Sequence, residues 1–141
     1  ALRAWKGQVY AIEKKEDALA LLKENRRKFA TDNLEIVSGT APEAMVELPV
    51  PTHAFIGGSS GNMNEIIRLL LDKNPGVRIV INCITLETVA EAMNAIRDFS
   101  LTDVDIVQLS AARSKSIGRY HMMMGENPIY IISCSGRGEE I

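Results

Sequence analysis

The sequence predicts an α/β protein built on a mostly parallel, doubly wound sheet. Short β-rich segments alternate with longer segments whose apolar residues recur at helical spacing, in the order β-α-β-β-α-β-α-β-β. Strands separated by helices favour parallel pairing, with helices on both faces of the sheet. The last two strands have no helix between them, so we expect them to pair as an antiparallel hairpin at one edge.

The first half of the chain begins with a β-rich, loosely alternating segment at 8–13 (QVYAIE), which predicts a strand. A helix is expected over 16–29, because acidic residues open it and Lys28 lies near its end, as the helix dipole favours. Further strands are predicted at 34–39 (LEIVSG) and 52–57 (THAFIG). Asn62 should cap the next helix, with Glu65 in the capping-box position.

The second half continues with a strand at 77–83 (VRIVINC) that is apolar enough to be central in the sheet. A third helix is predicted over 89–99, capped by Thr85 or Thr88. The final strands are expected at 104–110 (VDIVQLS) and 128–134 (PIYIISC), and the connection between them is interpreted as a long loop. We expect one domain, 1–134, followed by a flexible tail, 135–141.

The composition is that of a soluble globular domain: 141 residues, 46% hydrophobic, 24% charged, with a net charge of −2. This balance argues against a nucleic-acid partner, and no apolar run approaches the roughly 20 residues of a membrane helix. The chain shows no signal peptide, so we expect a cytoplasmic protein. Cys83 and Cys134 lie in apolar strand-like runs, which favours buried reduced thiols over a disulfide or a metal site.

Ligands of doubly wound folds bind beyond the carboxyl ends of the strands. In this chain those positions are Glu13, 39–41, 57–62, 82–85 and the connection 110–127. An acidic residue at the end of a strand can accept hydrogen bonds from two adjacent ribose hydroxyls. Glu13 could do this, or it could simply place a charge at the start of the next helix.

The glycine-rich stretch 57–62 (GGSSGN) has two functional interpretations. As G-x-S-x-G it makes Ser59 a hydrolase nucleophile, with Asp103 or Asp105 and then His121 as partners. However, His121 precedes the last strand and no HGGG-type oxyanion segment is present, so this alternative is disfavoured. As a glycine loop, the stretch tolerates positive φ and lets a ligand approach the backbone, although a tight strand-to-helix connector would use the same residues.

Positive charge concentrates in the connection between the last two strands, at Arg113, Lys115 and Arg119 with His121. These residues could bind carboxylates, or they could belong to a solvated loop. The three methionines 122–124 could line a flat apolar ligand, but packing in a core or a subunit interface is favoured.

Several segments together resemble one enzyme family. They are VYAIEKKEDALALLKEN, NLEIVSGTAPEAM, AFIGGSSGNMNEII, INCITLETVAEAM and QLSAAR, in that order. They resemble the decarboxylating C15-methyltransferases of precorrin and cobalt-precorrin in cobalamin biosynthesis, which also form the C-terminal domain of precorrin-6Y C5,15-methyltransferases. The resemblance implies a Rossmann-like class I fold that uses S-adenosyl-L-methionine to methylate C15 of the corrinoid and decarboxylate its C12 acetate. It also implies a homo-oligomer, with a C5-methyltransferase domain as a fused or separate partner.

The resemblance assigns roles to particular residues. Glu13 would hold the ribose of the cofactor, Thr40 and Ala41 would lie by the adenine, and 57–59 beside the methionine part. The residues expected at the corrinoid are Gly61, Asn62, Thr85, Glu87, Arg113 and Arg119; those expected at the cofactor also include Gly57, Gly58 and Ser59. The resemblance implies no metal site and identifies no catalytic acid or base.

The sequence departs from the family pattern in two places. Thr40 stands where relatives typically carry Asp, which weakens one adenosine contact or replaces it by backbone. The family also opens with a central strand that ends in a G-x-G-x-G-like loop around the cofactor. Because this sequence starts with ALRAWKG, inside the helix after that loop, we expect the domain to be N-terminally incomplete.

Overall fold

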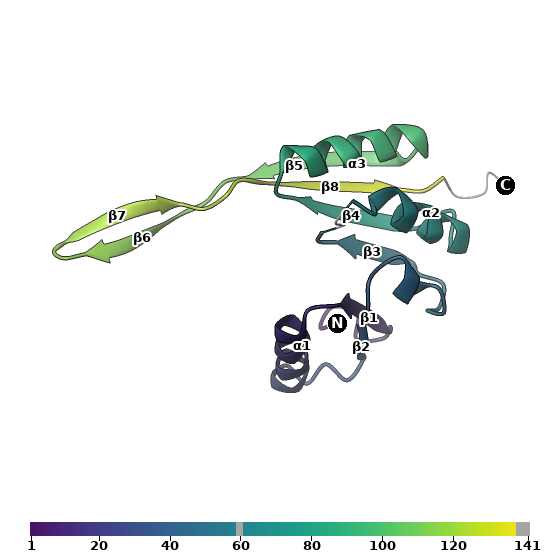
Figure 1. Cartoon of the computed structure of the whole chain (residues 1–141), viewed down its shortest axis with the longest axis horizontal. Coiled ribbons are helices and arrows are strands. Elements are labelled where there is room, and N and C mark those ends of the chain that lie inside the picture. Colours follow the sequence, from purple (N-terminus) through teal and green to yellow (C-terminus); the bar gives the residue numbers. More distant parts are fainter. Residues whose placement is uncertain (59–60, 138–141) are drawn as a thin grey trace. The chain divides into compact units, whose positions relative to one another are not determined.

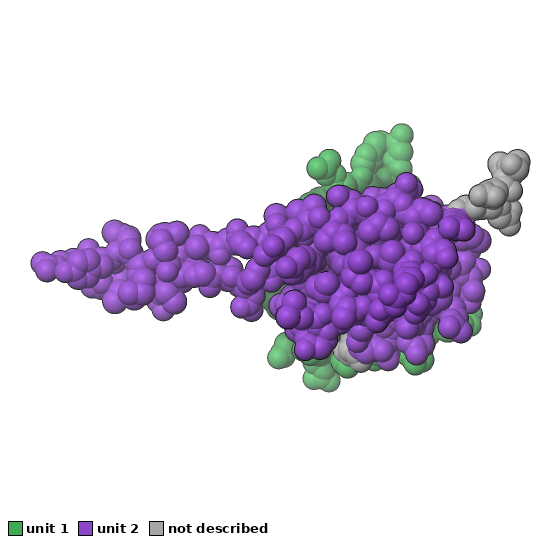
Figure 2. All heavy atoms as spheres, turned by 90° about the horizontal axis from the view of Figure 1, so that it is seen from above, with its two compact units in different colours: residues 1–49 green, residues 50–141 purple. Residues whose placement is uncertain are grey.

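The structure, a computed structural model, describes residues 1–58 and 61–137. The chain forms two compact units, unit 1 (1–49) and unit 2 (50–141), which are coloured separately in Figure 2.

Unit 1 is a parallel β-α-β unit (Figure 1). Its elements are β1 (Val9–Glu13), α1 (Glu16–Lys28), β2 (Leu34–Ser38) and the short 3-10 helix η1 (Glu43–Met45). The register places Val9 opposite Leu34 and Glu13 opposite Ser38, so both strands end at the same edge. The predicted helix is confirmed, with acidic residues in its first turn and basic residues in its last turn.

Unit 2 contains a mixed four-stranded sheet with the order β3-β4-β8-β5. Its elements are β3 (His53–Ile56), α2 (Met63–Lys73), β4 (Arg78–Cys83), α3 (Leu86–Asp98), β5 (Thr102–Leu109) and β8 (Ile129–Ser135). Strand β3 pairs parallel with β4, whereas β8 is antiparallel to both of its neighbours. The predicted antiparallel pair β5–β8 is therefore confirmed, and β8 lies on the inner side of that pair, against β4.

The main core lies on one face of this sheet. Ile79, Ile81 and Cys83 alternate along β4 and are completely buried, as are Ile132 and Cys134 of β8. Helix α2 supplies its side of the core with one apolar face, Met63, Ile66, Ile67 and Leu70, and α3 adds Ala92 and Ala95.

The opposite face of the sheet in unit 2 is more open, because Phe55 of β3 is 69% exposed. Helices on both faces were expected, whereas α2 and α3 share one face. No helix within the described residues is both long and apolar enough to cross a bilayer.

The sequence did not predict the hairpin formed by β6 (Ala112–Ile117) and β7 (Tyr120–Gly125). The interpretation of 110–127 as a loop was wrong, because these strands pair antiparallel from Ala112–Gly125 to Ile117–Tyr120. The hairpin continues β5 and β8 outward as a narrow extension of unit 2 (Figures 1 and 2), which we call the arm. A hydrogen bond from the Glu126 N–H to the Ala111 carbonyl, 2.9 Å long, joins its two strands at the base.

The two predicted helix caps differ in outcome. The Thr85 hydroxyl accepts a hydrogen bond from the Thr88 N–H at 3.1 Å, which confirms Thr85 as the N-cap of α3. Asn62 is the N-cap residue of α2, but its side chain makes no capping hydrogen bond, so the predicted capping box is not formed.

The two cysteines are free and buried, as predicted. Burial raises the pKa of both thiols above the usual 9.0; the charge of Glu91 adds to this at Cys83, and Arg78 partly opposes it at Cys134. Because only the thiolate reacts, we expect neither cysteine to be labelled by a thiol reagent in the native protein at pH 8, whereas both should react in denaturant. Mass spectrometry after a timed exposure measures this. Rapid labelling of either residue without denaturant would contradict the packing described here.

Candidate functional site

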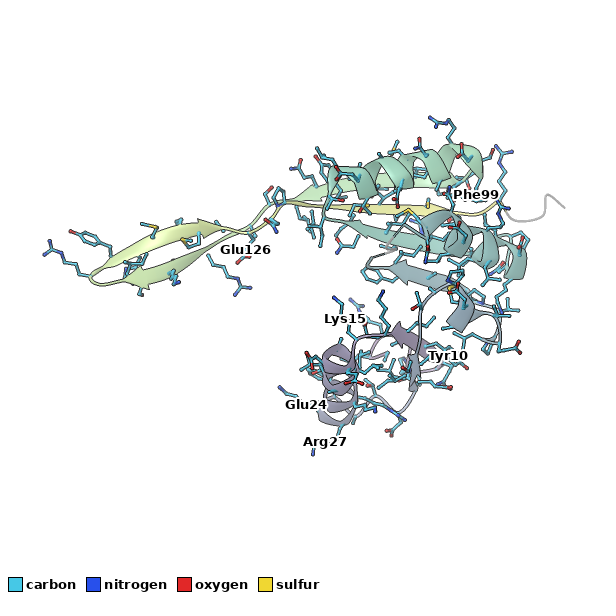
Figure 3. All side chains as sticks on the ribbon, viewed as in Figure 1. Tyr10, Lys15, Glu24, Arg27, Phe99 and Glu126 are labelled. Carbon is cyan, nitrogen blue, oxygen red and sulfur yellow. The ribbon has the colours of Figure 1, made fainter. Side chains whose placement is uncertain are left out.

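The carboxylate of Glu13 is fixed by the chain that follows it. The backbone N–H groups of Lys14 and Lys15 donate hydrogen bonds to Glu13 Oε1 at 2.8 and 2.9 Å, just before α1 begins (Lys15 is labelled in Figure 3). These two backbone hydrogen bonds lower the pKa of Glu13, so the group is ionised at neutral pH. Both go to Oε1, and no described residue donates to Oε2, which can therefore accept from a ligand.

Gly39 lies beside Glu13 at the end of β2. Its N–H donates to the Glu13 carbonyl at 3.0 Å, which joins the ends of the two strands. Gly39 has a φ of +157°, and a Cβ there would lie 2.9 Å from Cβ of Ala44, so the position favours glycine on both grounds. The carbonyl of the next residue, Thr40, accepts from the Ala44 N–H at 2.9 Å, which turns the chain at this edge. Unit 1 thus brings Glu13, Gly39 and Thr40 together, with Ala41 following in the same turn.

The second group of predicted site residues lies at one edge of the sheet in unit 2. Ile56 is opposite Ile81, Cys83 is opposite Tyr130, and Leu109 is opposite Ile129, so β3, β4 and β5 all end at this edge. The glycine loop after β3, Thr85 after β4 and the base of the arm after β5 are therefore neighbours.

The glycine loop itself is exposed at Gly57, Gly58 and Gly61. Of these three glycines only Gly61 has a positive φ, at +87°, and a Cβ at Gly58 or Gly61 would meet no atom within 4 Å. The loop therefore leaves open space above the backbone at two positions. Ser59 lies outside the described residues.

Among the predicted site residues at the start of α2 and α3, Thr85 already has a structural role. The Thr85 hydroxyl caps α3 and also lies 2.9 Å from the Thr88 hydroxyl, so a ligand would compete with the cap. Glu87 is exposed in the first turn of α3, and Asn62 is partly buried at the start of α2. Glu87 and Thr85 are thus both exposed, but the Thr85 hydroxyl is engaged in the cap.

One polar residue at this edge, Asn82, belongs to the strand-end stretch 82–85 predicted to bind a ligand, although the sequence assigned it no role of its own. Asn82 lies one residue before the end of β4, and its Oδ1 is buried with no hydrogen-bond partner among the described residues. An unpaired buried acceptor costs about 1–3 kcal/mol, so a donor from a ligand or another segment would be stabilising there. The signal in the sequence is a lone polar residue near the end of an otherwise apolar strand.

The basic residues predicted to bind carboxylates do not converge. Arg113, at the base of the arm, lies 4.0 Å from Glu126, and both side chains are exposed. Arg119, at the hairpin turn, donates to the Tyr120 hydroxyl at 3.1 and 3.2 Å. Five residues lie between the two arginines, and four of them belong to β6, so the two are separated by roughly 15 Å. They can contact the same ligand only if it is large or if another chain contributes.

The geometry does not support the serine hydrolase alternative. Asp105 pairs with Ser133 in the body of the sheet, whereas His121 pairs with Ser116 in the arm. The extended chain between Asp105 and Ser116 spans roughly 30 Å, so this acid and this histidine do not form a catalytic pair. No group of three potential metal ligands occurs in the described parts of the chain.

Comparisons with known proteins all point to the same family. The profile of the precorrin methyltransferase domain matches residues 1–135. A probable cobalt-precorrin-6B C(15)-methyltransferase (decarboxylating) of Methanothermobacter thermautotrophicus is 39% identical over 127 residues, covering 89% of this chain and 66% of that protein. The chain thus spans just under two thirds of the length of this relative.

Solved structures agree with the sequence match. The precorrin-6y C5,15-methyltransferase of Geobacter metallireducens superposes with a TM-score of 0.81 at 32% identity, covering 92% of this chain and 68% of that one. A SAM-dependent O-methyltransferase of Thermotoga maritima, 16% identical, superposes with a TM-score of 0.69 over 98% of this chain and 53% of its own, and shares the fold alone. The predicted Rossmann-like class I methyltransferase fold is confirmed.

Proposed function

The chain belongs to the precorrin methyltransferase domain family, and from this we propose that it methylates C15 of a precorrin or cobalt-precorrin macrocycle, with S-adenosylmethionine as the donor, and removes the C12 acetate carboxyl group as carbon dioxide. The observation that carries the proposal is the match along residues 1–135, together with the named activity of the Methanothermobacter relative. The proposed partners are the corrinoid substrate, a second copy of the chain and a C5-methyltransferase domain.

The residues of unit 1 fit the ribose of this cofactor. Glu13 is ionised and held in one orientation by two backbone N–H groups, so its Oε2 can accept from the ribose hydroxyls without prior ordering. Thr40 and Ala41 follow in the adjacent turn, where we place the adenine. Gly57, Gly58 and Ser59 would face the methionine part.

We place the corrinoid at the edge where β3, β4 and β5 end. Gly61 leaves room for a large macrocycle, while Asn62, Thr85 and Glu87 would border it. Arg113 and Arg119 would bind peripheral carboxylates of the substrate by charge-assisted hydrogen bonds.

The chemistry needs little from the protein beyond positioning. When bound, S-adenosylmethionine supplies an activated methyl group for in-line transfer. The residues of the chain hold the two reactants in line, and no covalent enzyme intermediate is required. The macrocycle itself can accept the electron pair released with carbon dioxide, so no residue is assigned as a catalytic acid.

Calorimetric titration with S-adenosylmethionine tests the first half of the proposal, with the Methanothermobacter relative as positive control. Incubation with cobalt-precorrin-6B and a methyl-labelled donor tests the second half. Mass spectrometry should show a product that has gained one labelled methyl group and lost one carbon dioxide. Methyl transfer without loss of carbon dioxide would indicate a methyltransferase of another specificity. Failure to bind the donor, when the relative binds it, would overturn the proposal for this chain.

A further inference from the structure

Large apolar side chains are exposed at the edge of unit 2 where we place the corrinoid. Ile84 and Leu86, on either side of the residue that caps α3, are 56% and 76% exposed, and Leu109 at the end of β5 is 49% exposed. A single exposed apolar residue is ordinary in a folded protein, but several at one edge mark a surface that binds a ligand or a partner.

The strand register brings these side chains together. Leu109 is opposite Ile129, and Ile84 follows Cys83, whose partner is Tyr130, so Ile84 and Leu109 lie level with Ile129 on its two sides. This row crosses three neighbouring strands, β4, β8 and β5, and is roughly 10 Å wide. Its central residue, Ile129, is half-buried. The row is therefore a continuous apolar surface at the carboxyl ends of β4 and β5.

Leu86 adjoins this row because of its place in the chain. It is the first residue of α3 and comes two residues after Ile84, so the two Cα atoms are at most about 7 Å apart. The side chain of Thr85 between them is engaged in the cap of α3. The apolar surface thus extends from β5 to the start of α3.

Charged groups of opposite sign border the apolar residues. Glu87 follows Leu86 directly and lies in the first turn of α3. On the other side, Arg113 comes four residues after Leu109, and Glu126 lies 4.0 Å from it. An exposed ion pair of this length is weak, so Arg113 can exchange it for a carboxylate of a ligand. The border therefore favours ligand carboxylates on the side of β5 and disfavours them beside Glu87.

We propose that Ile84, Leu86 and Leu109 form an apolar seat for one face of the corrinoid macrocycle, with peripheral carboxylates directed toward Arg113. The inference rests on the proposed function and deepens it, because it names side chains that contact the substrate. A corrinoid carries its carboxylates on the periphery, and the ring system between them is largely apolar. Binding sites for such ligands are mostly apolar, with a few polar groups that fix the orientation. Burial of the ring against the seat favours binding independently of the charged groups.

Fluorescence titration with uroporphyrin, a flat tetrapyrrole with carboxylates around its ring, tests the seat. The wild type should bind this probe, and Leu86→Gln should bind it at least about tenfold more weakly, because burial of one leucine accounts for about that factor. The matched control is Met93→Gln, since Met93 is also exposed and lies on α3, roughly 10 Å beyond Leu86. Its affinity for the probe should equal that of the wild type. Circular dichroism should show that both variants fold.

The salt dependence of the same titration separates apolar from ionic contacts. Sodium chloride at about 1 M screens exposed charges and leaves apolar burial intact. Leu86→Gln should therefore bind more weakly than the wild type at low and at high salt by about the same factor. Arg113→Gln should bind more weakly only at low salt. With cobalt-precorrin-6B as substrate, Leu86→Gln should raise KM about tenfold and leave the affinity for S-adenosylmethionine unchanged.

Three outcomes would overturn the seat. They are equal affinity of Leu86→Gln and the wild type for uroporphyrin, an equal loss in Met93→Gln, and a wild type that binds S-adenosylmethionine by calorimetry but not uroporphyrin. Binding of uroporphyrin by a chain that does not bind S-adenosylmethionine would support the seat and count against the proposed function alone. The two failures are therefore distinguishable.

Discussion

Replacing Glu13 with alanine is expected to weaken S-adenosylmethionine binding by about 100-fold. The variant loses the two hydrogen bonds that the Glu13 carboxylate would accept from the ribose hydroxyls. Hydrogen bonds to a charged group are among the stronger polar contacts in proteins. Glu13→Gln keeps the shape and one acceptor, so it should bind about tenfold more weakly than the wild type. Calorimetric titration measures both affinities.

Glu16→Gln is the matched control, because Glu16 opens α1 only three residues away and has no assigned ligand. The affinity of the wild type should also stay constant from about pH 8 to pH 5, because the folded chain lowers the pKa of Glu13 below its usual 4.5 and the carboxylate stays ionised over that range. Binding that is unchanged in Glu13→Ala would mean that the ribose lies elsewhere. A clear loss of affinity around neutral pH would point to a different titrating group.

Replacing Gly136 with alanine is expected to destabilise the fold by about 3 kcal/mol. Gly136 follows β8, and its N–H donates to the Val77 carbonyl at 3.0 Å. A Cβ at this position would collide with the Pro75 carbonyl oxygen and would lie 2.6 Å from Cδ2 of Leu71. The leucine can rotate, but the carbonyl belongs to the turn between α2 and β4, so the backbone itself must move.

Urea unfolding followed by circular dichroism measures this loss, and the melting temperature should fall by roughly 5–10 °C. Gly7→Ala is the control, because a Cβ at Gly7 meets its nearest atom at an ordinary 3.6 Å. The control should stay within about 0.5 kcal/mol of the wild type. If Gly136→Ala were as stable as the wild type, the backbone of the turn at Pro75 would have to move at little cost in free energy.

The strands and helices that bury one face were predictable from the sequence, because burial imposes a regular pattern. Strand β4 alternates Ile79, Ile81 and Cys83 toward the core, and α2 repeats its apolar residues every three or four positions. The arm has no such pattern, since none of its residues is buried, and its six-residue strands read as a basic loop followed by methionines. Gly118, with a φ of +59° between Ile117 and Tyr120, was the local sign of a hairpin turn.

The site was predictable only as far as strand ends could be recognised. The position of Glu13 at the end of β1 follows from the alternation of that strand, but its fixed orientation comes from the backbone N–H groups that follow it. Asn82 lies in the predicted strand-end stretch 82–85, but its unpaired buried oxygen could not be predicted, because that is a property of packing. The prediction that the Asn62 side chain caps α2 was wrong, because a favourable residue type does not by itself give the side chain a capping hydrogen bond.

Strand β8 is hydrogen-bonded on both sides in the body of unit 2, and β7 leads into it through residues 126–128. Its register is fixed by the buried side chains of Ile132 and Cys134, and this fixes the starting point of the arm. Adding one residue to each strand of the arm would lengthen it by about 3.4 Å and leave the body unchanged. A residue added to one strand alone would turn every side chain beyond it to the opposite face. The length of the arm can therefore change only in paired steps if each of its side chains is to keep its face of the hairpin.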